Sequence, residues 1–216
     1  MTQTLILKLG GSLLTTGRDL MQFLSEYAFV KRTTRQMVIV PGGGPFAESV
    51  RALQRRLEIS DDTAHWMAVL TMHQYGLFLA SGAPETPVLE RLEDVRATRT
   101  GLCILLPYRV LRADDALPHT WHVTSDTIAA FIAHKLGENT LIKLTDVDGL
   151  LDENGALIDH LQAQELLGIE HTGCIDAQLP RFLLEHGMSC VIVNGRHPER
   201  VIAVIEGRAT ICTRIE

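Results

Sequence analysis

The chain opens on an apolar run, Leu5-Ile-Leu-Lys-Leu-Gly-Gly-Ser-Leu-Leu14, which carries one lysine and two adjacent glycines. Short apolar runs without alternation are typical of strands that are buried on both faces of a parallel sheet. A strand that ends in glycines lets the backbone approach a ligand closely and directs its N–H groups at an anion. Two interpretations of Lys8 are open. It adds positive charge at that anion, or its ammonium group snorkels to solvent at the end of the sheet.

Strand-like runs alternate with helical patterns along the whole chain. Strands are predicted at residues 5–9, 36–40, 103–106, 140–144, 189–193 and 209–211. Helices are predicted at residues 18–33, 45–57, 61–79, 125–135, 163–168, 178–185 and 198–205. This alternation predicts an α/β fold, a three-layer α/β/α sandwich around a largely parallel central sheet with right-handed crossovers. No repeat or linker divides the chain, so we expect a single domain over residues 1–216.

The composition limits the classes of partner and compartment. The chain has 216 residues, of which 46% are hydrophobic, and a formal net charge of −6. That charge argues against nucleic acid or an anionic membrane surface as a partner, so a bound anion must be held by a local arrangement. The cysteines are widely spaced and form no CxxC pair: Cys103, Cys174, Cys190 and Cys212. Without a signal segment or a membrane-spanning apolar run, we expect a reduced, cytoplasmic protein.

A second glycine-ended strand lies at residues 38–46, Val-Ile-Val-Pro-Gly-Gly-Gly-Pro-Phe. Each glycine in regular structure costs about 0.5–1 kcal/mol relative to alanine, so three in a row indicate a need for bare backbone. A helix that begins after such a loop offers an anion site at its N-terminus. The pattern matches neither the Rossmann nor the Walker fingerprint. A plain tight turn remains the alternative.

Two polar stretches complete the pattern. At residues 124–130, Thr-Ser-Asp-Thr-Ile-Ala-Ala, Asp126 either favours the dipole of a helix or orients a lysine from a neighbouring strand end. At residues 144–150, Leu-Thr-Asp-Val-Asp-Gly-Leu, hydroxyl, carboxylate and glycine follow a strand, where α/β folds hold ligands. Lys143 precedes this loop and is either part of the site or a surface lysine at the strand end. Glycine backbones and lysines at one sheet edge are what polyphosphate binding requires.

In this order the stretches KLGGS, PGGG, TSDTIAA and LTDVDGL resemble the amino acid kinase family, over nearly the whole chain. The resemblance implies a carbamate kinase-like fold and a homo-oligomer, a dimer or higher. It implies ATP as cosubstrate and Mg²⁺ that enters with ATP, with no metal ligand from the protein. Lys8 is then expected to neutralise the transferred phosphoryl group, and Asp126 to orient that lysine. Family acceptors are already ionised at neutral pH, so catalysis rests on positioning and charge neutralisation.

The resemblance also implies which residues bind the two substrates. The nucleotide and its phosphates are assigned to Gly10, Gly11, Ser12, Thr145, Asp146, Val147, Asp148 and Gly149. The acceptor is assigned to Gly42, Gly43, Gly44, Tyr75, Trp121, Thr124 and Ser125. Many family members carry a second catalytic lysine in a segment that corresponds here to residues 171–177, which contain none. Lys143 is the candidate for the missing charge.

Finer matches indicate a branch of the family. Residues 72–76 (MHQYG), 117–126 (LPHTWHVTSD), 173–180 (GCIDAQLP) and 193–196 (VNGR) resemble the kinase branch of methanofuran biosynthesis. That branch implies a phosphorylated small-molecule acceptor, an (aminomethyl)furanylmethyl phosphate, which is converted to its diphosphate. His122 stands where this branch has an acidic residue. Tyr75 and Trp121 would stack on the furan ring, or are buried aromatic anchors.

Three hypotheses therefore stand beside one another. The first is an ATP-dependent kinase of the methanofuran branch. The second is a kinase similar to uridylate kinase or isopentenyl phosphate kinase, which differs in its acceptor. The third is a non-catalytic protein of the same fold that binds a nucleotide or an oxyanion, which the missing second lysine favours.

Overall fold

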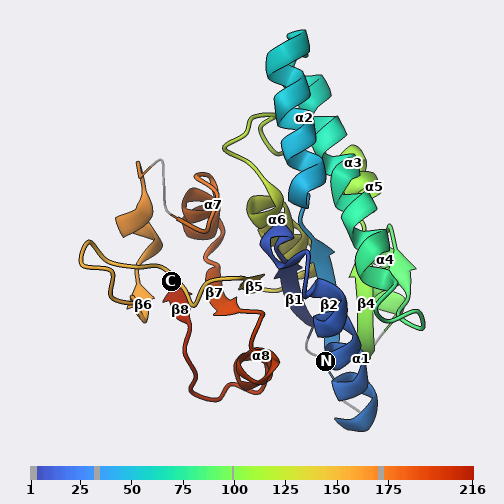
Figure 1. The fold of residues 1–216 in the computed structure, drawn as a ribbon, viewed down its shortest axis with the longest axis vertical. Coiled ribbons are helices and arrows are strands. Elements are labelled where there is room, and N and C mark those ends of the chain that lie inside the picture. The colour runs from blue at the N-terminus through green and yellow to red at the C-terminus, as the bar shows by residue number, and fades with distance from the viewer. Residues whose placement is uncertain (1–3, 32–34, 99, 170–172) are drawn as a thin grey trace.

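A computed structural model describes residues 4–31, 35–98, 100–169 and 173–216 (Figure 1). The strands are β1 (Thr4–Leu9), β2 (Gln36–Pro41), β3 (Val88–Leu89), β4 (Gly101–Leu105), β5 (Thr140–Thr145), β6 (His160–Leu161), β7 (Ser189–Asn194) and β8 (Thr213–Ile215). The α-helices are α1 (Gly17–Lys31), α2 (Gly44–Leu57), α3 (Asp61–Ala80), α4 (Leu92–Ala97), α5 (Tyr108–Ala113), α6 (Ser125–Leu136), α7 (Leu179–His186) and α8 (Pro198–Ile205). Two short 3₁₀ helices, η1 (Gly11–Leu13) and η2 (Ala163–Leu166), complete the described elements.

The strands form one sheet in the order β3-β4-β2-β1-β5-β7-β8-β6. All neighbouring strands are parallel except β7 and β8, which are antiparallel. The predicted three-layer α/β/α sandwich with a largely parallel sheet is therefore confirmed. Strands β1 and β5 lie at the centre, and their carboxyl ends carry the lysine–glycine stretch and the polar loop that follows Leu144.

Both faces of the sheet are covered, which explains why the strands are apolar without alternation. Along β1, Ile6 belongs to a core that includes α6 and α7, whereas Leu7 and Leu9 belong to a second core that includes α1 and α8. Successive side chains of a strand point to opposite faces, so Lys8 lies on the same face as Ile6 and is directed toward α6.

Helices α2 and α3 pack against each other and extend beyond the sheet as a pair (Figure 1). Helix α2 ends at Leu57 and is capped by Glu58, which has a left-handed backbone conformation with φ of 54°. Helix α3 begins at Asp61 and is capped by Ser60, whose side chain accepts a hydrogen bond from the backbone N–H of Thr63 at 3.3 Å. This cap satisfies one of the N–H groups left free at a helix start and fixes the turn between the two helices.

Most predicted elements are present within two residues of their bounds, but two predictions are wrong. The strand predicted at 209–211 lies instead at Thr213–Ile215, because Ile211 is 46% exposed whereas Thr213 and Ile215 are fully buried against β7. The helix predicted at 163–168 is a single 3₁₀ turn that ends at Leu166. The end of the helix predicted at 18–33 falls outside the described residues. Strands β3 and β6 and helices α4 and α5 were not predicted, since they are too short to show a periodic pattern.

Among the described residues, none of the helices has the length and apolar character needed for crossing a membrane.

Candidate active site

Two buried lysines lie side by side at the centre of the sheet. Lys8 of β1 is paired in register with Lys143 of β5, so both side chains leave the same face of the sheet. They are 5% and 3% exposed. Like charges on adjacent strands repel each other, so this pair requires an anion between the two ammonium groups.

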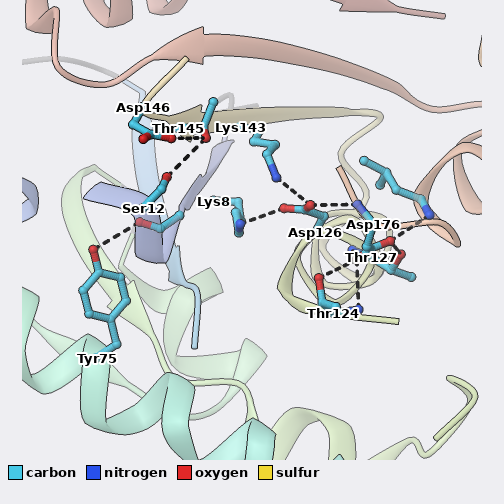
Figure 2. A network of polar contacts seen from close by, with 12 residues as sticks. Lys8, Ser12, Tyr75, Thr124, Asp126, Thr127, Lys143, Thr145, Asp146 and Asp176 are labelled. Atoms are coloured by element: carbon cyan, nitrogen blue, oxygen red, sulfur yellow. Dashed lines mark hydrogen bonds and ion pairs between the residues drawn. The ribbon is translucent and has the colours of Figure 1, made fainter. Parts of the chain in front are cut away.

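Asp126 supplies that anion from the first turn of α6 (Figure 2). Its carboxylate lies 2.7 Å from Nζ of Lys8 and 2.5 Å from Nζ of Lys143, one oxygen to each lysine. Although burial alone raises the pKa of a carboxyl group, Lys143 and Lys8 hold the pKa of Asp126 well below its usual range. The structure thus places Asp126 beside Lys8, where its predicted role requires it to be, and Lys143 on the other side of the same carboxylate.

A second buried carboxylate, Asp176, was not predicted to have a role. It accepts five hydrogen bonds, from the backbone N–H groups of Thr124, Thr127 and Leu179 and from the hydroxyls of Thr124 and Thr127. Its own N–H donates to Asp126 at 3.1 Å. Burial and the charge of Asp126 raise the pKa of Asp176, while these donors favour its ionised form. Burial lowers the pKa of Lys8, and the neighbouring carboxyl groups of Asp126 and Asp176 oppose that shift.

Asp176 therefore joins the segment 173–177 to the start of α6. The signal in the sequence was weak: an aspartate three residues before the start of α7, where it accepts from the N–H of Leu179 as a capping residue does. The segment belongs to the stretch that lacks the family lysine, of which residues 171 and 172 lie outside the described part of the chain.

The two glycine loops meet above the ends of β1 and β2. The N–H of Gly10 donates to Leu144 O at 2.9 Å, and the N–H of Gly42 donates to Leu9 O at 2.8 Å. A Cβ atom on Gly11 would lie 2.1 Å from the Cα of Gly44, which itself has a left-handed φ of 56°. Only glycine permits this approach, and Gly44 is also the first residue of α2.

A cavity of about 960 Å³ opens in front of these loops. Its wall is built from one face each of α2 and α3, the start of α6, residues 120–124 and residues 173–177. It is lined by eight of the residues that the sequence assigned to the site: Gly11, Ser12, Gly43, Gly44, Trp121, Thr124, Ser125 and Asp126. A cavity of this size, with few polar groups converging on one end, is typical of a small-molecule site.

Tyr75 is not in this cavity, and the prediction that it binds the acceptor is wrong. Its side chain is fully buried in the core between the sheet and α1. Its hydroxyl donates a hydrogen bond to the carbonyl oxygen of Gly10 at 3.2 Å (Figure 2). Tyr75 thus supports the first glycine loop from behind. Gly42 is absent from the cavity wall too, since it is hydrogen-bonded to the end of β1.

Trp121 is held at the cavity wall by two residues of α2. The guanidinium carbon of Arg51 lies 4.4 Å from the ring centroid, and the indole N–H donates to Gln54 at 2.5 Å. The side chain is half-buried. A cation over one ring face and a bonded N–H fix the ring's orientation, as aromatic groups at binding sites require.

The loop at residues 145–149 lies on the other side of the first glycine loop. Ser12 connects the two, since its hydroxyl is 3.3 Å from that of Thr145. Asp146 is paired with Arg196 at 3.4 Å, and Asp148 accepts from Asn194 and Arg200 at 2.8 Å each. Gly149 is required because a Cβ there would come 2.1 Å from the hydroxyl of Thr213. None of residues 145–149 lines the cavity; Val147 is 42% exposed.

Comparisons with known proteins agree with this geometry. A model described as "Amino acid kinase family" matches residues 3–194. A [5-(aminomethyl)furan-3-yl]methyl phosphate kinase of Methanocaldococcus jannaschii is 34% identical, over 97% of this chain and 96% of the relative. A uridylate kinase of Thermoplasma volcanium is 24% identical over 100% of this chain and 99% of its own length. The crystal structure of a UMP kinase from Ureaplasma parvum superposes with a TM-score of 0.75 at 18% identity, covering 100% of this chain and 96% of that one.

Proposed function

The chain belongs to the amino acid kinase family and is an ATP-dependent kinase, and we propose that its acceptor is [5-(aminomethyl)furan-3-yl]methyl phosphate. The support for this acceptor is the relative of that name, which matches along almost the full length of both chains. The uridylate kinase match is weaker in identity over a similar span. The observation that carries the kinase chemistry is the pair of buried ammonium groups, Lys8 and Lys143, on one carboxylate at the mouth of two glycine loops.

The proposed reaction joins two phosphates. An oxygen of the acceptor's phosphate attacks the γ-phosphorus of ATP, a new P–O bond forms, and the bond between the γ-phosphorus and its bridging oxygen breaks. ADP leaves with that oxygen, and the acceptor becomes a diphosphate. A phosphate monoester is largely dianionic at neutral pH, so no general base has to remove a proton from the attacking oxygen. The chain's contribution is positioning and charge neutralisation.

Charge neutralisation is assigned to Lys8 and Lys143. The two substrates bring several negative charges together, and the buried ammonium groups lower the energy of the charge on the transferred phosphoryl group. Asp126 is a positioning residue, because it binds one lysine with each oxygen and holds both against the same face of the sheet. Lys143 on β5 thereby supplies the second charge that residues 173–177 do not.

Each glycine loop is assigned to one of the two substrates. The acceptor's phosphate is placed at Gly43 and Gly44, which line the cavity at the N-terminus of α2, where the helix dipole favours an anion. The phosphates of ATP are placed at Gly10, Gly11 and Ser12, and the rest of the nucleotide along residues 145–149, outside the acceptor cavity. Trp121, Thr124 and Ser125 line the acceptor side.

Mg²⁺ is proposed to arrive with ATP. In the described part of the chain, no three histidine, cysteine, aspartate or glutamate side chains form a cluster able to hold a metal ion. Asp126 is committed to two lysines. Such a site suits an Mg²⁺ ion that keeps its coordinated waters and is held mainly by the phosphates of the substrates, where the ion adds positive charge. Assembly as a homo-oligomer stays a prediction.

The test is ADP release with a panel of acceptors in the presence of ATP and Mg²⁺. The panel contains the aminomethylfuran phosphate, UMP and isopentenyl phosphate. We expect turnover with the first compound at least ten times that with either of the others. A preference for UMP or isopentenyl phosphate would contradict the proposed acceptor and assign the protein to another acceptor class. ATP binding without ADP release for any acceptor would favour the non-catalytic alternative.

A further inference from the structure

His65 is a polar side chain of α3 that lines the acceptor cavity. It is 8% exposed and lines the cavity from α3, on the same helix face as Asp61, Ala68 and Met72. Its ring contacts the rings of Trp66 and His119, and within the described residues neither ring nitrogen is among the buried side-chain atoms without a partner, so the nitrogens are accessible in the cavity. An imidazole nitrogen that is accessible in a cavity and not used by the protein is available to a ligand.

The charge of His65 follows from its neighbour. His119 stacks on it with ring centroids 4.0 Å apart and planes 12° from parallel. Nδ1 of His119 lies 2.6 Å from Asp62 and Nε2 lies 2.8 Å from Asp115. Ionised carboxylates only accept hydrogen bonds, so both nitrogens of His119 donate and its ring is an imidazolium. Protonation of His65 would place two imidazolium rings face to face 4.0 Å apart, and their repulsion keeps His65 neutral.

The pKa of His65 is lowered and that of His119 is raised, in agreement with this geometry. Burial and the neighbouring charge of His119 lower the pKa of His65 to about 4. Burial opposes charge on His119 too, but its bonds to Asp115 and Asp62 raise the pKa of that ring. A neutral imidazole has one N–H donor and one nitrogen lone pair, and that lone pair accepts from a cationic donor.

The distance along α3 fits a small acceptor. A Cβ on Gly43 would lie 2.8 Å from the hydroxyl of Thr71, so the phosphate end of the cavity is level with that residue. His65 is six residues earlier, which corresponds to about 9 Å along a helix. That separation is on the scale of one small ring with a substituent at each end.

The charges around the far end of the cavity favour a cation. Two carboxylates, Glu48 and Asp61, line the cavity there. Among the described residues that line the cavity, the guanidinium is that of Arg51, which lies over Trp121 and has Glu48 at 3.9 Å. The phosphate end, by contrast, is formed by Gly43 and Gly44 at the start of α2, where the helix dipole is positive, and by Asp126, which pairs with the two lysines. The cavity is therefore polarised along its length.

We propose that His65 recognises an ammonium group at the end of the acceptor opposite its phosphate, as a neutral hydrogen-bond acceptor that His119 keeps uncharged. This inference rests on the proposed function, since it takes the acceptor to be a phosphomonoester bound at Gly43 and Gly44. Glu48 and Asp61 contribute negative potential at the same end. The substrate class is thus an amine-bearing phosphomonoester, and His119 is a positioning residue.

The experiment compares two acceptors that differ only in the amine: the aminomethylfuran phosphate and its methyl analogue, in which a hydrogen replaces the amino group. Calorimetric binding of each is measured with Mg²⁺ and a non-hydrolysable ATP analogue. The proteins are the wild type, His65→Phe and His65→Gln. We expect the wild type to bind the amine-bearing ester about 10- to 100-fold more tightly than the methyl analogue. His65→Phe should lose that preference, and His65→Gln, whose amide oxygen accepts a hydrogen bond, should recover part of it.

His73→Gln is the matched control, because His73 lies on the same helix but accepts from the N–H of Tyr108 outside the cavity. It should keep the wild-type preference. An equal preference in the wild type and His65→Phe would overturn the assignment of His65, as would a wild type without preference. A wild type that shows the preference but releases no ADP would retract the kinase proposal and retain His65 as the ammonium site.

Discussion

Gly11 and Gly44 approach each other through their backbones, and this contact joins the two glycine loops at the ends of β1 and β2. A Cβ atom on Gly11 would be 2.1 Å from the Cα of Gly44 and 2.5 Å from its nitrogen. Both neighbours are backbone atoms, which cannot rotate away as a flexible side chain does. A methyl group at residue 11 must therefore push the start of α2 away from the end of β1.

Gly11→Ala is expected to reduce kcat/KM by at least 100-fold, because it separates the loops that position the two phosphates. Steady-state assay of ADP release measures this. Gly137→Ala is the matched control. Gly137, at the end of α6, has a left-handed φ of 83°, which favours glycine, but no atom lies within 4 Å of a Cβ there. The control should lose about 1 kcal/mol of stability and keep its kcat/KM. Equal activity in both variants would contradict the shared phosphate site.

The shared carboxylate of Asp126 predicts an order of stability among three variants. Lys8→Met or Lys143→Met removes one ammonium and leaves a one-to-one pair with Asp126. Asp126→Asn leaves two buried ammonium groups facing each other, so it should cost the most, about 3–5 kcal/mol. Urea unfolding measures the order. A greater loss in either lysine variant than in Asp126→Asn would contradict it.

The same lysine variants test catalysis. Each should lower kcat by about 100- to 1000-fold, because each removes positive charge from the transferred phosphoryl group. ATP affinity, measured by calorimetry, should fall far less. A Lys143→Met enzyme with normal kcat would show that Lys143 only balances the charge of Asp126, and Lys8 would then be the single catalytic lysine.

Tyr75 and Trp121 are expected to behave differently, although both were predicted to bind the acceptor. Tyr75→Phe removes the bond to Gly10 O and should cost about 0.5–1.5 kcal/mol of stability with no change in the acceptor's KM. Trp121→Ala removes part of the cavity wall and should raise the acceptor's KM at least tenfold while the KM for ATP stays constant. Thermal unfolding and initial rates separate the two effects. A raised acceptor KM in Tyr75→Phe would contradict its position behind the loop.

The His65–His119 pair predicts opposite pH effects on stability. The folded-state pKa of His65 is about 4, below the ordinary 6.5, so its contribution is present above pH 6.5 and is lost as pH falls toward 4. The folded-state pKa of His119 is raised, so its contribution is present below pH 6.5 and is lost as pH rises through the raised value. Urea midpoints are measured from pH 4 to 9. Compared with the wild type, His65→Phe should lose less stability at acid pH, and His119→Gln should lose less stability at alkaline pH. Nitrogen-15 NMR of labelled histidines checks the charges directly. A charged His65 at pH 6.5 would contradict the assignment.

Much of the fold followed from local pattern. Each glycine-ended apolar run was recognisable in the sequence, because bare backbone after a buried strand leaves a local signature. The strand at 209–211 failed since Ile211 looks apolar in isolation but lies outside the sheet, whereas Thr213 is buried and accepts and donates hydrogen bonds with Leu150 and Ile158. Local composition does not reveal which of two neighbouring short runs will find a partner strand.

The sequence by itself determined the family and the layered fold and predicted roles for Lys8, Asp126 and the glycines, since the motifs that indicate them are runs of consecutive residues. Only the tertiary structure decided that Lys143 shares Asp126 with Lys8, that Asp176 holds the start of α6, and that Tyr75 faces away from the cavity. The register of β1 against β5 aligns two lysines that are 135 positions apart in the chain. Such contacts depend on strand order and side-chain direction, which arise only when distant segments pack together.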